Sequence, residues 1–213
     1  MQQQCDLSFY TRLTKATNRI ATQIQLGQRD TCILSAASLW EILTRLGIQA
    51  ECLRVRVAVH GRENNPKQYG CVLGGDGDGC RVPAASKDMW HGHLVVVAES
   101  RWLLDPTLDQ VNKGQPWLGA RPLAGAVSAT FLRGAEHLKS TTGTKGSWVS
   151  YFAFPGRGGW RHAGDFRPSR RHAIVRAVLE LPRYRDMVRI PLSAKVHYPT
   201  SGTLRGPWAP YFG

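Results

Sequence analysis

The chain has 213 residues, with 28 Lys and Arg against 15 Asp and Glu, and a formal net charge of +13. This length predicts one domain or one domain with an extension, and 42% hydrophobic residues suffice for a packed core, which argues against a disordered chain. No apolar run approaches the roughly 20 residues that a membrane-spanning helix needs, and the N-terminus lacks the features of a secretory signal, so we expect a cytoplasmic protein without a membrane span.

Two helices are predicted first along the chain. Apolar residues recur at helical spacing over 8–25 and predict an amphipathic helix. A break follows, in which Asp30 or Thr31 can cap a second helix over about 32–46. The apolar residues of this second helix cover more than one stripe, which is typical of a buried helix. Gly47 suits the position just after its C-terminus.

The remaining chain predicts mainly strands. Residues 53–59 alternate between apolar and other side chains, as a strand does, and a long polar connection covers 60–90. Two short runs, 93–98 and 101–105, are joined by a turn and predict a strand pair. Further predicted elements are strands at 127–132 and 148–154 and a helix at about 170–181. This order predicts an α+β fold with one major helix packed on an antiparallel sheet.

Three residues with reactive or ionisable side chains stand at the ends of these elements. Cys32 starts the buried helix, His93 starts a strand, and Asp105 ends the next strand. The free N–H groups of a helix start favour an anion, so a thiol placed there ionises more readily. A neighbouring His can pair with the thiolate and act as a general acid, and a carboxylate can orient the imidazole. Because a turn joins the two strands, we expect His93 and Asp105 to lie side by side.

Alternatives to this trio remain open. His91 has the same strand parity as His93, and Asp109 competes with Asp105. A zinc site could be built from residues whose spacing matches no standard pattern: Cys71, Cys80, His91 and His93. We therefore expect no metal, and the thiol chemistry requires no cofactor.

Two longer motifs contain the trio. In DTCILSAASLWEILTRLGIQAECLRVRV, the Cys is followed by a helix, a Leu-Gly-Ile turn and a strand. In HLVVVAESRWLLDPTLDQ, a strand His precedes a strand that ends in Asp-Pro-Thr. Together they span roughly residues 28–110, about 40% of the chain, and they resemble the transglutaminase-like superfamily of papain-type thiol enzymes. Many members of that superfamily carry an aromatic residue where this chain has Ile33 and a Trp where it has Val95.

The resemblance implies a papain-like or transglutaminase-like core in which Cys32 is the nucleophile, His93 the base and acid, and Asp105 the orienting carboxylate. Papain-type enzymes often add a Gln shortly before the Cys to stabilise the oxyanion, and Gln28 and Gln25 are the candidates here. The implied reaction cleaves or transfers an acyl group at an amide or peptide bond through a thioester. Hydrolysis is favoured because water needs no second binding site.

The charge separates the two halves of the chain. Residues 1–110 carry 12 basic and 11 acidic residues, whereas 111–213 carry 16 and 4. We therefore expect a catalytic core over 1–135 and a basic, Gly/Pro/Arg-rich extension over 136–213, partly packed on that core. The alternative function is a basic protein that binds nucleic acid or another polyanion and has a degenerate triad. A solvated basic extension has the same composition, and no nucleic-acid-binding motif decides between these.

Overall fold

The computed structural model describes residues 5–25, 32–60, 69–74, 92–113, 119–141, 147–153 and 168–197. The helices within these ranges are α1 (Leu7–Gln25), α2 (Cys32–Arg45), α3 (Ala129–Leu132), α4 (Pro168–Leu179) and α5 (Pro182–Arg185), with a 3-10 helix η1 (Leu108–Lys113). The strands are β1 (Ala50–His60), β2 (Tyr69–Leu73), β3 (His93–Ala98), β4 (Trp102–Asp105), β5 (Leu123–Ala126), β6 (His137–Thr141) and β7 (Trp148–Ala153). None of the helices in these ranges is long and apolar enough to cross a membrane.

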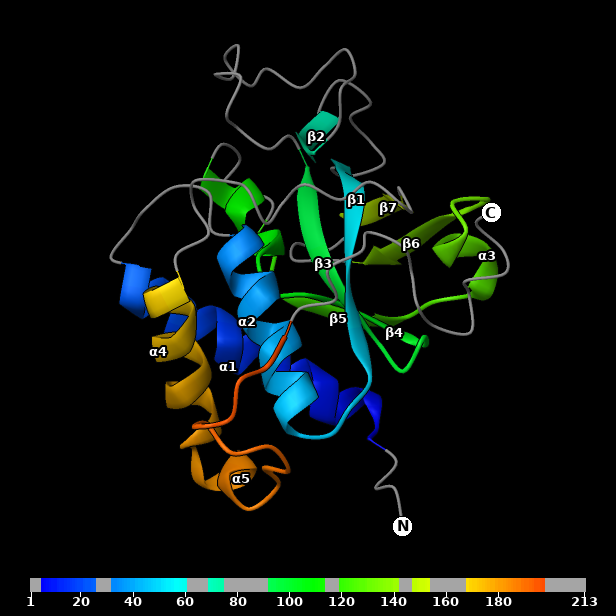
Figure 1. Ribbon diagram of the computed structural model, residues 1–213. Helices are drawn as coiled ribbons and strands as arrows, with labels where there is room; N and C mark the ends of the chain where they lie inside the picture. The colour runs from blue at the N-terminus through cyan, green and yellow to red at the C-terminus, as the bar shows by residue number, and fades with distance from the viewer. Residues whose placement is uncertain are drawn as a thin grey trace.

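The described strands form one seven-stranded sheet in the order β5-β4-β3-β1-β7-β6, with β2 paired to β1. Every one of these pairs is antiparallel. Helix α2 packs against β3 and β1, while α1 and α4 pack against α2 and each other (Figure 1). The predicted α+β class is therefore confirmed.

Strand β3 is buried on both faces because two apolar clusters meet at it. On one face, Leu94 and Val96 pack with the apolar sides of α1, α2 and α4. On the other face, Val95 and Val97 pack with residues of β1, β4, β7 and η1. This double burial accounts for the unbroken apolar run of the strand, since neither face meets water.

Helix α2 ends as its sequence predicts. Gly47 adopts φ +77°, its N–H bonds to Thr44 O at 3.0 Å, and the N–H of Ile48 bonds to Leu43 O at 2.9 Å. A side chain at position 47 would also approach Arg189 Cγ to 3.1 Å. The positive φ therefore favours glycine here, and a side chain would also press on that of Arg189.

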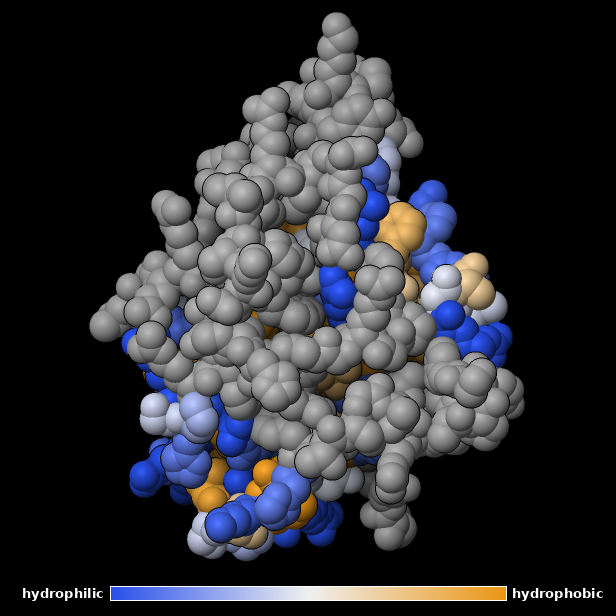
Figure 2. Space-filling model, turned by 45° about the horizontal axis from the view of Figure 1, so that its top comes forward, coloured by the Kyte–Doolittle hydropathy of each residue, from blue (hydrophilic) through white to orange (hydrophobic). Residues whose placement is uncertain are grey.

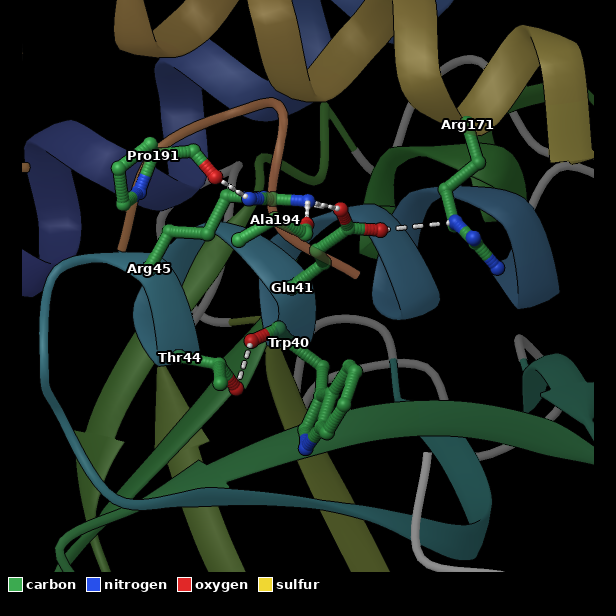
Figure 3. A network of polar contacts seen from close by, with 7 residues as sticks. All are labelled: Trp40, Glu41, Thr44, Arg45, Arg171, Pro191 and Ala194. Carbon is green, nitrogen blue, oxygen red and sulfur yellow. Dashed lines mark hydrogen bonds and ion pairs between the residues drawn. The ribbon is translucent and has the colours of Figure 1, made fainter. Parts of the chain in front are cut away.

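A buried ionic network fixes the C-terminal segment to α2 (Figure 3). Arg45 donates to Glu41 Oε1 at 2.7 and 2.9 Å and also to the carbonyl oxygens of Pro191 and Ala194. Arg171 of α4 contacts Glu41 Oε2 at 2.9 Å. Both oxygens of this buried carboxylate are thus paired, and α2 is tied to α4 and to residues 191–194.

One predicted strand is wrong. Residues 127–132 form no strand, because β5 ends at Ala126 and α3 begins at Ala129. Ser128 caps α3 by accepting a hydrogen bond from the N–H of Phe131 at 3.0 Å. Helical geometry at a capping Ser therefore outweighs the β-branched and aromatic composition of this segment.

The residues after position 135 contribute to the same sheet and helical layer. Strand β7 pairs with β1 along six residue pairs, and β6 pairs with β7. Helix α4 packs on α1 and α2. Strands β2, β5 and β6 have no counterpart in the sequence prediction, whereas the predicted strand at 148–154 and helix at 170–181 correspond to β7 and α4.

Candidate active site

The centre of the candidate site is a buried pair formed by His93 and Asp105. Strands β3 and β4 run antiparallel with Val96 opposite Leu104, so the start of β3 lies beside the end of β4. His93 Nε2 lies 2.8 Å from Asp105 Oδ2, and neither residue is more than 1% exposed. The pairing of these two residues that the strand turn predicts is therefore confirmed.

Two further groups hold the Asp105 carboxylate. The hydroxyl of Tyr151, in β7, donates to Oδ2 at 3.0 Å, and the N–H of Thr107 donates to Oδ1 at 3.0 Å. The carboxylate thus has partners on both oxygens, which fixes its plane. Burial, the Asp105 charge and this hydrogen bond raise the pKa of Tyr151 well above its ordinary value, so the phenol stays a donor.

The charge state of His93 follows from the same contacts. Burial alone lowers its pKa, but the Asp105 charge and hydrogen bond raise it, as does a hydrogen bond with the Cys32 side chain. The balance raises the pKa of His93 to about 10, so the ring is protonated near neutral pH. Because Asp105 occupies Nε2, Nδ1 is the ring nitrogen left to contact the thiol.

Cys32 reaches this pair from the first residue of α2. It is 9% exposed, and its side chain interacts with His93. The helix start supplies backbone N–H groups that have no partner within the helix. A thiol, an imidazolium and a carboxylate thus follow one another, each on a different element. This arrangement can present the sulfur as a nucleophile, transfer a proton to a leaving group and stabilise the charge on the ring.

A glycine lies directly against the backbone of His93. Gly74 follows β2 and has φ +70°. A Cβ added to it would lie 2.4 Å from the backbone nitrogen of His93 and 2.8 Å from the backbone oxygen of Val55. No side chain fits this space without displacing the start of β3. Glycine at position 74 therefore permits the backbone after β2 to lie directly against the start of β3.

Of the two glutamines predicted as oxyanion donors, the structure describes Gln25. Gln28 lies outside the described residues. Gln25 is the last residue of α1 and is 4% exposed, and neither its amide nitrogen nor its amide oxygen has a hydrogen-bond partner among the described residues. Most buried side-chain polar groups are paired, so an unpaired buried amide close in sequence to Cys32 is unusual.

Of the alternatives to His93 and Asp105, the structure describes Asp109 but not His91. Asp109 accepts hydrogen bonds from Asn18 Nδ2 at 3.1 and 3.2 Å, whereas Asp105 holds His93. His91 lies outside the described residues, as do Cys80 and the Cys71 side chain of the zinc alternative. The described residues hold no group of three or more metal-ligating side chains.

Sequence reasoning missed Tyr151. Its strand was predicted, and the alternation of Val149, Tyr151 and Ala153 would have placed the phenol on a buried face. The pairing of β7 with β1, which brings Tyr151 to Asp105, joins residues about 90 positions apart and leaves no local signal.

No family model, curated protein or solved structure matches this chain. The resemblance to transglutaminase-like enzymes therefore rests on the motifs around Cys32, His93 and Asp105.

Proposed function

We propose that this protein is a thiol enzyme of the transglutaminase-like, papain-type class that cleaves or transfers an acyl group at an amide or peptide bond. Cys32 is the nucleophile, His93 the acid and base, and Asp105 the orienting carboxylate. One observation carries the proposal: the fully buried His93–Asp105 pair, whose histidine also interacts with a cysteine at a helix start. A buried histidine whose pKa is strongly shifted by a carboxylate, and which also contacts a cysteine, is typical of functional sites.

The reaction begins when the Cys32 sulfur attacks the carbonyl carbon and the carbonyl oxygen takes the electron pair. The tetrahedral intermediate collapses when the C–N bond breaks and protonated His93 gives its proton to the leaving amine. A thioester remains, and His93 is now a neutral base. It takes a proton from water, the resulting hydroxide displaces the thiolate, and the free acid leaves.

Asp105 acts throughout on His93 alone. Its hydrogen bond fixes the ring so that Nδ1 is left for the thiol, and its charge stabilises the imidazolium. The oxyanion would be held by the N–H of Cys32 and by the Gln25 amide, which lacks another partner among the described residues. Water needs no second binding site, so hydrolysis is the favoured outcome, with a peptide or protein amide as substrate.

The proposal is tested by the reactivity of Cys32. The protein is treated with iodoacetamide between pH 5 and 9, and the alkylation rate of each cysteine is measured by peptide mass spectrometry. We expect Cys32 to react faster than Cys5 and Cys52 near neutral pH, although Cys32 is as buried as Cys5, and we expect His93→Ala to slow it at least tenfold.

Cys5 serves as the internal control, because it is a buried cysteine outside any disulfide and is influenced by Glu99 rather than by a histidine. Burial raises the pKa of Cys5, so its reaction should stay slow in every variant. Equal rates for Cys32 and Cys5, or no effect of His93→Ala on Cys32, would overturn the proposal.

A further inference from the structure

A basic groove lies between α1 and the α4–α5 turn, and the described residues that line it lie outside the Cys32–His93–Asp105 site. It encloses a volume of about 500 Å³, which is within the usual range for small-molecule sites. Its lining residues are Arg12, Lys15, Ala16, Arg19, Leu181, Pro182, Arg183 and Tyr184. Figure 2 shows hydrophilic side chains gathered around a few apolar ones at the end of the molecule that carries α5.

The charge of this groove has one sign. Four of its lining residues are cationic, and no acidic residue is among the described residues that line it. Three of the four lie on α1, where Arg12, Lys15 and Arg19 stand at i, i+3 and i+7 and are all exposed. Like charges at i+3 and i+4 destabilise a helix, and α1 contains no acidic residue that would offset them. Helix stability therefore does not explain this pattern.

Cationic side chains of α1 and α5 both influence Tyr184. Burial raises the pKa of Tyr184, while the charges of Arg183 on α5 and Arg12 on α1 oppose that rise. The Tyr184 hydroxyl is buried and has no hydrogen-bond partner among the described residues. The Tyr184 ring makes an edge-to-face contact with Phe9, at 6.1 Å between ring centroids.

The groove also has an apolar floor. Ala16 of α1 and the Leu181–Pro182 pair before α5 lie between the charged side chains. Phosphate groups are the anions that arginine matches best, because the guanidinium fork can bind two of their oxygens at once. A single phosphate would balance at most half of the four positive charges, whereas a triphosphate balances nearly all of them.

We propose that this groove binds a small molecule that carries a triphosphate group, with its uncharged portion against the apolar floor. Nucleoside triphosphates are the class that combines these two parts. This groove is separate from the thiol site, since none of the described residues that line it belongs to α2, β3, β4 or β7.

The test is calorimetric titration of the full chain with ATP and, separately, with inorganic tripolyphosphate, in magnesium-free buffer at about 150 mM salt. Lys15→Ala/Arg19→Ala removes two groove cations, and Ala suits a helix, so the fold should persist. Arg121→Ala/Lys139→Ala is the matched control, because it removes one exposed Arg and one exposed Lys elsewhere.

We expect the groove variant to weaken binding at least tenfold and the control variant to change it less than twofold. Tighter binding of ATP than of tripolyphosphate identifies a nucleotide that uses the apolar floor, and equal binding identifies the phosphate chain alone as the ligand. The proposal is overturned if both variants lose affinity equally, if neither compound binds below about 1 mM, or if a single-stranded oligonucleotide binds while both triphosphates do not. Cys32 alkylation in the groove variant should match wild type, which separates this test from that of the thiol site.

Discussion

Tyr151 and His93 share one carboxylate oxygen. The Tyr151 hydroxyl donates to Asp105 Oδ2 at 3.0 Å, and the same atom lies 2.8 Å from His93 Nε2. The two donors come from β7 and β3, which flank β1 on opposite sides. The orientation of the histidine therefore depends on a strand that lies far from it in the sequence.

The first prediction concerns this shared oxygen. Tyr151→Phe removes the donor and lets the carboxylate rotate, so we expect Cys32 alkylation at neutral pH to slow about tenfold, which is the scale of one hydrogen bond to a charged group. Peptide mass spectrometry measures the rate.

Tyr10→Phe is the matched control, because the Tyr10 hydroxyl donates to Glu99 Oε2 at 2.8 Å and Tyr10 is equally buried. Both variants should lose about 1.5 to 3 kcal/mol of unfolding free energy. If Cys32 is alkylated more slowly in both variants, Tyr151 contributes only to the stability of the fold.

The second prediction is a pH dependence of stability. The folded state raises the pKa of His93 to about 10 from its ordinary value of 6.5. The folded protein therefore binds this proton more tightly than the unfolded chain does. The stability that results is fully present below pH 6.5 and is lost as the pH rises through about 10.

Urea unfolding at pH 6, 8 and 10 measures this effect. We expect the wild type to lose more unfolding free energy between pH 6 and 10 than His93→Gln, which has no such proton. Subtracting the unfolding free energy of His93→Gln from that of the wild type at each pH removes the contribution of the ionisable groups that both proteins contain. Parallel curves would contradict the ion pair between His93 and Asp105.

The third prediction concerns the Gln25 amide. Gln25→Leu removes a buried polar group that has no partner among the described residues, so the unfolding free energy should not fall. If the amide holds the oxyanion, acylation of Cys32 by p-nitrophenyl acetate should slow about 100-fold.

Alkylation by iodoacetamide forms no tetrahedral oxyanion and serves as the control reaction. Gln25→Leu should leave its rate unchanged. Equal slowing of both reactions would instead show that Gln25 shapes the position of the thiol.

The fourth prediction concerns the network at Glu41. Arg45→Ala leaves a buried carboxylate with Arg171 as its remaining ion-pair partner and releases the carbonyls of residues 191 and 194. We expect it to cost about 3 kcal/mol of unfolding free energy in urea titration.

Arg176→Ala removes a pair with the same i, i+4 spacing, Arg176–Glu180, which lies on the surface. Its unfolding midpoint should match that of wild type, since exposed pairs contribute little. A similar loss in both variants would argue against a role for the network in holding the C-terminal segment.

Local patterns of the sequence were enough to predict much of this fold. Helical spacing identified α1 and α2, and Gly47 marked the end of α2 because only glycine readily adopts its backbone conformation. The tight turn between β3 and β4 was enough to pair His93 with Asp105, since it brings the ends of both strands together. Over residues 127–132, the β-like composition led to a wrong strand prediction, because Ser128 instead caps the short helix α3.

Contacts between residues far apart in the sequence could be seen only in the tertiary structure. The pairing of β7 with β1 brings Tyr151 to Asp105, and Gly74 lies directly against the backbone of His93. The net charge of +13 says that basic residues are in excess, but only packing shows that four of them line one groove between α1 and α5. Periodicity and turn chemistry act within a few residues and can be read along the chain, whereas sheet order and helix docking depend on which surfaces bury the most apolar area together.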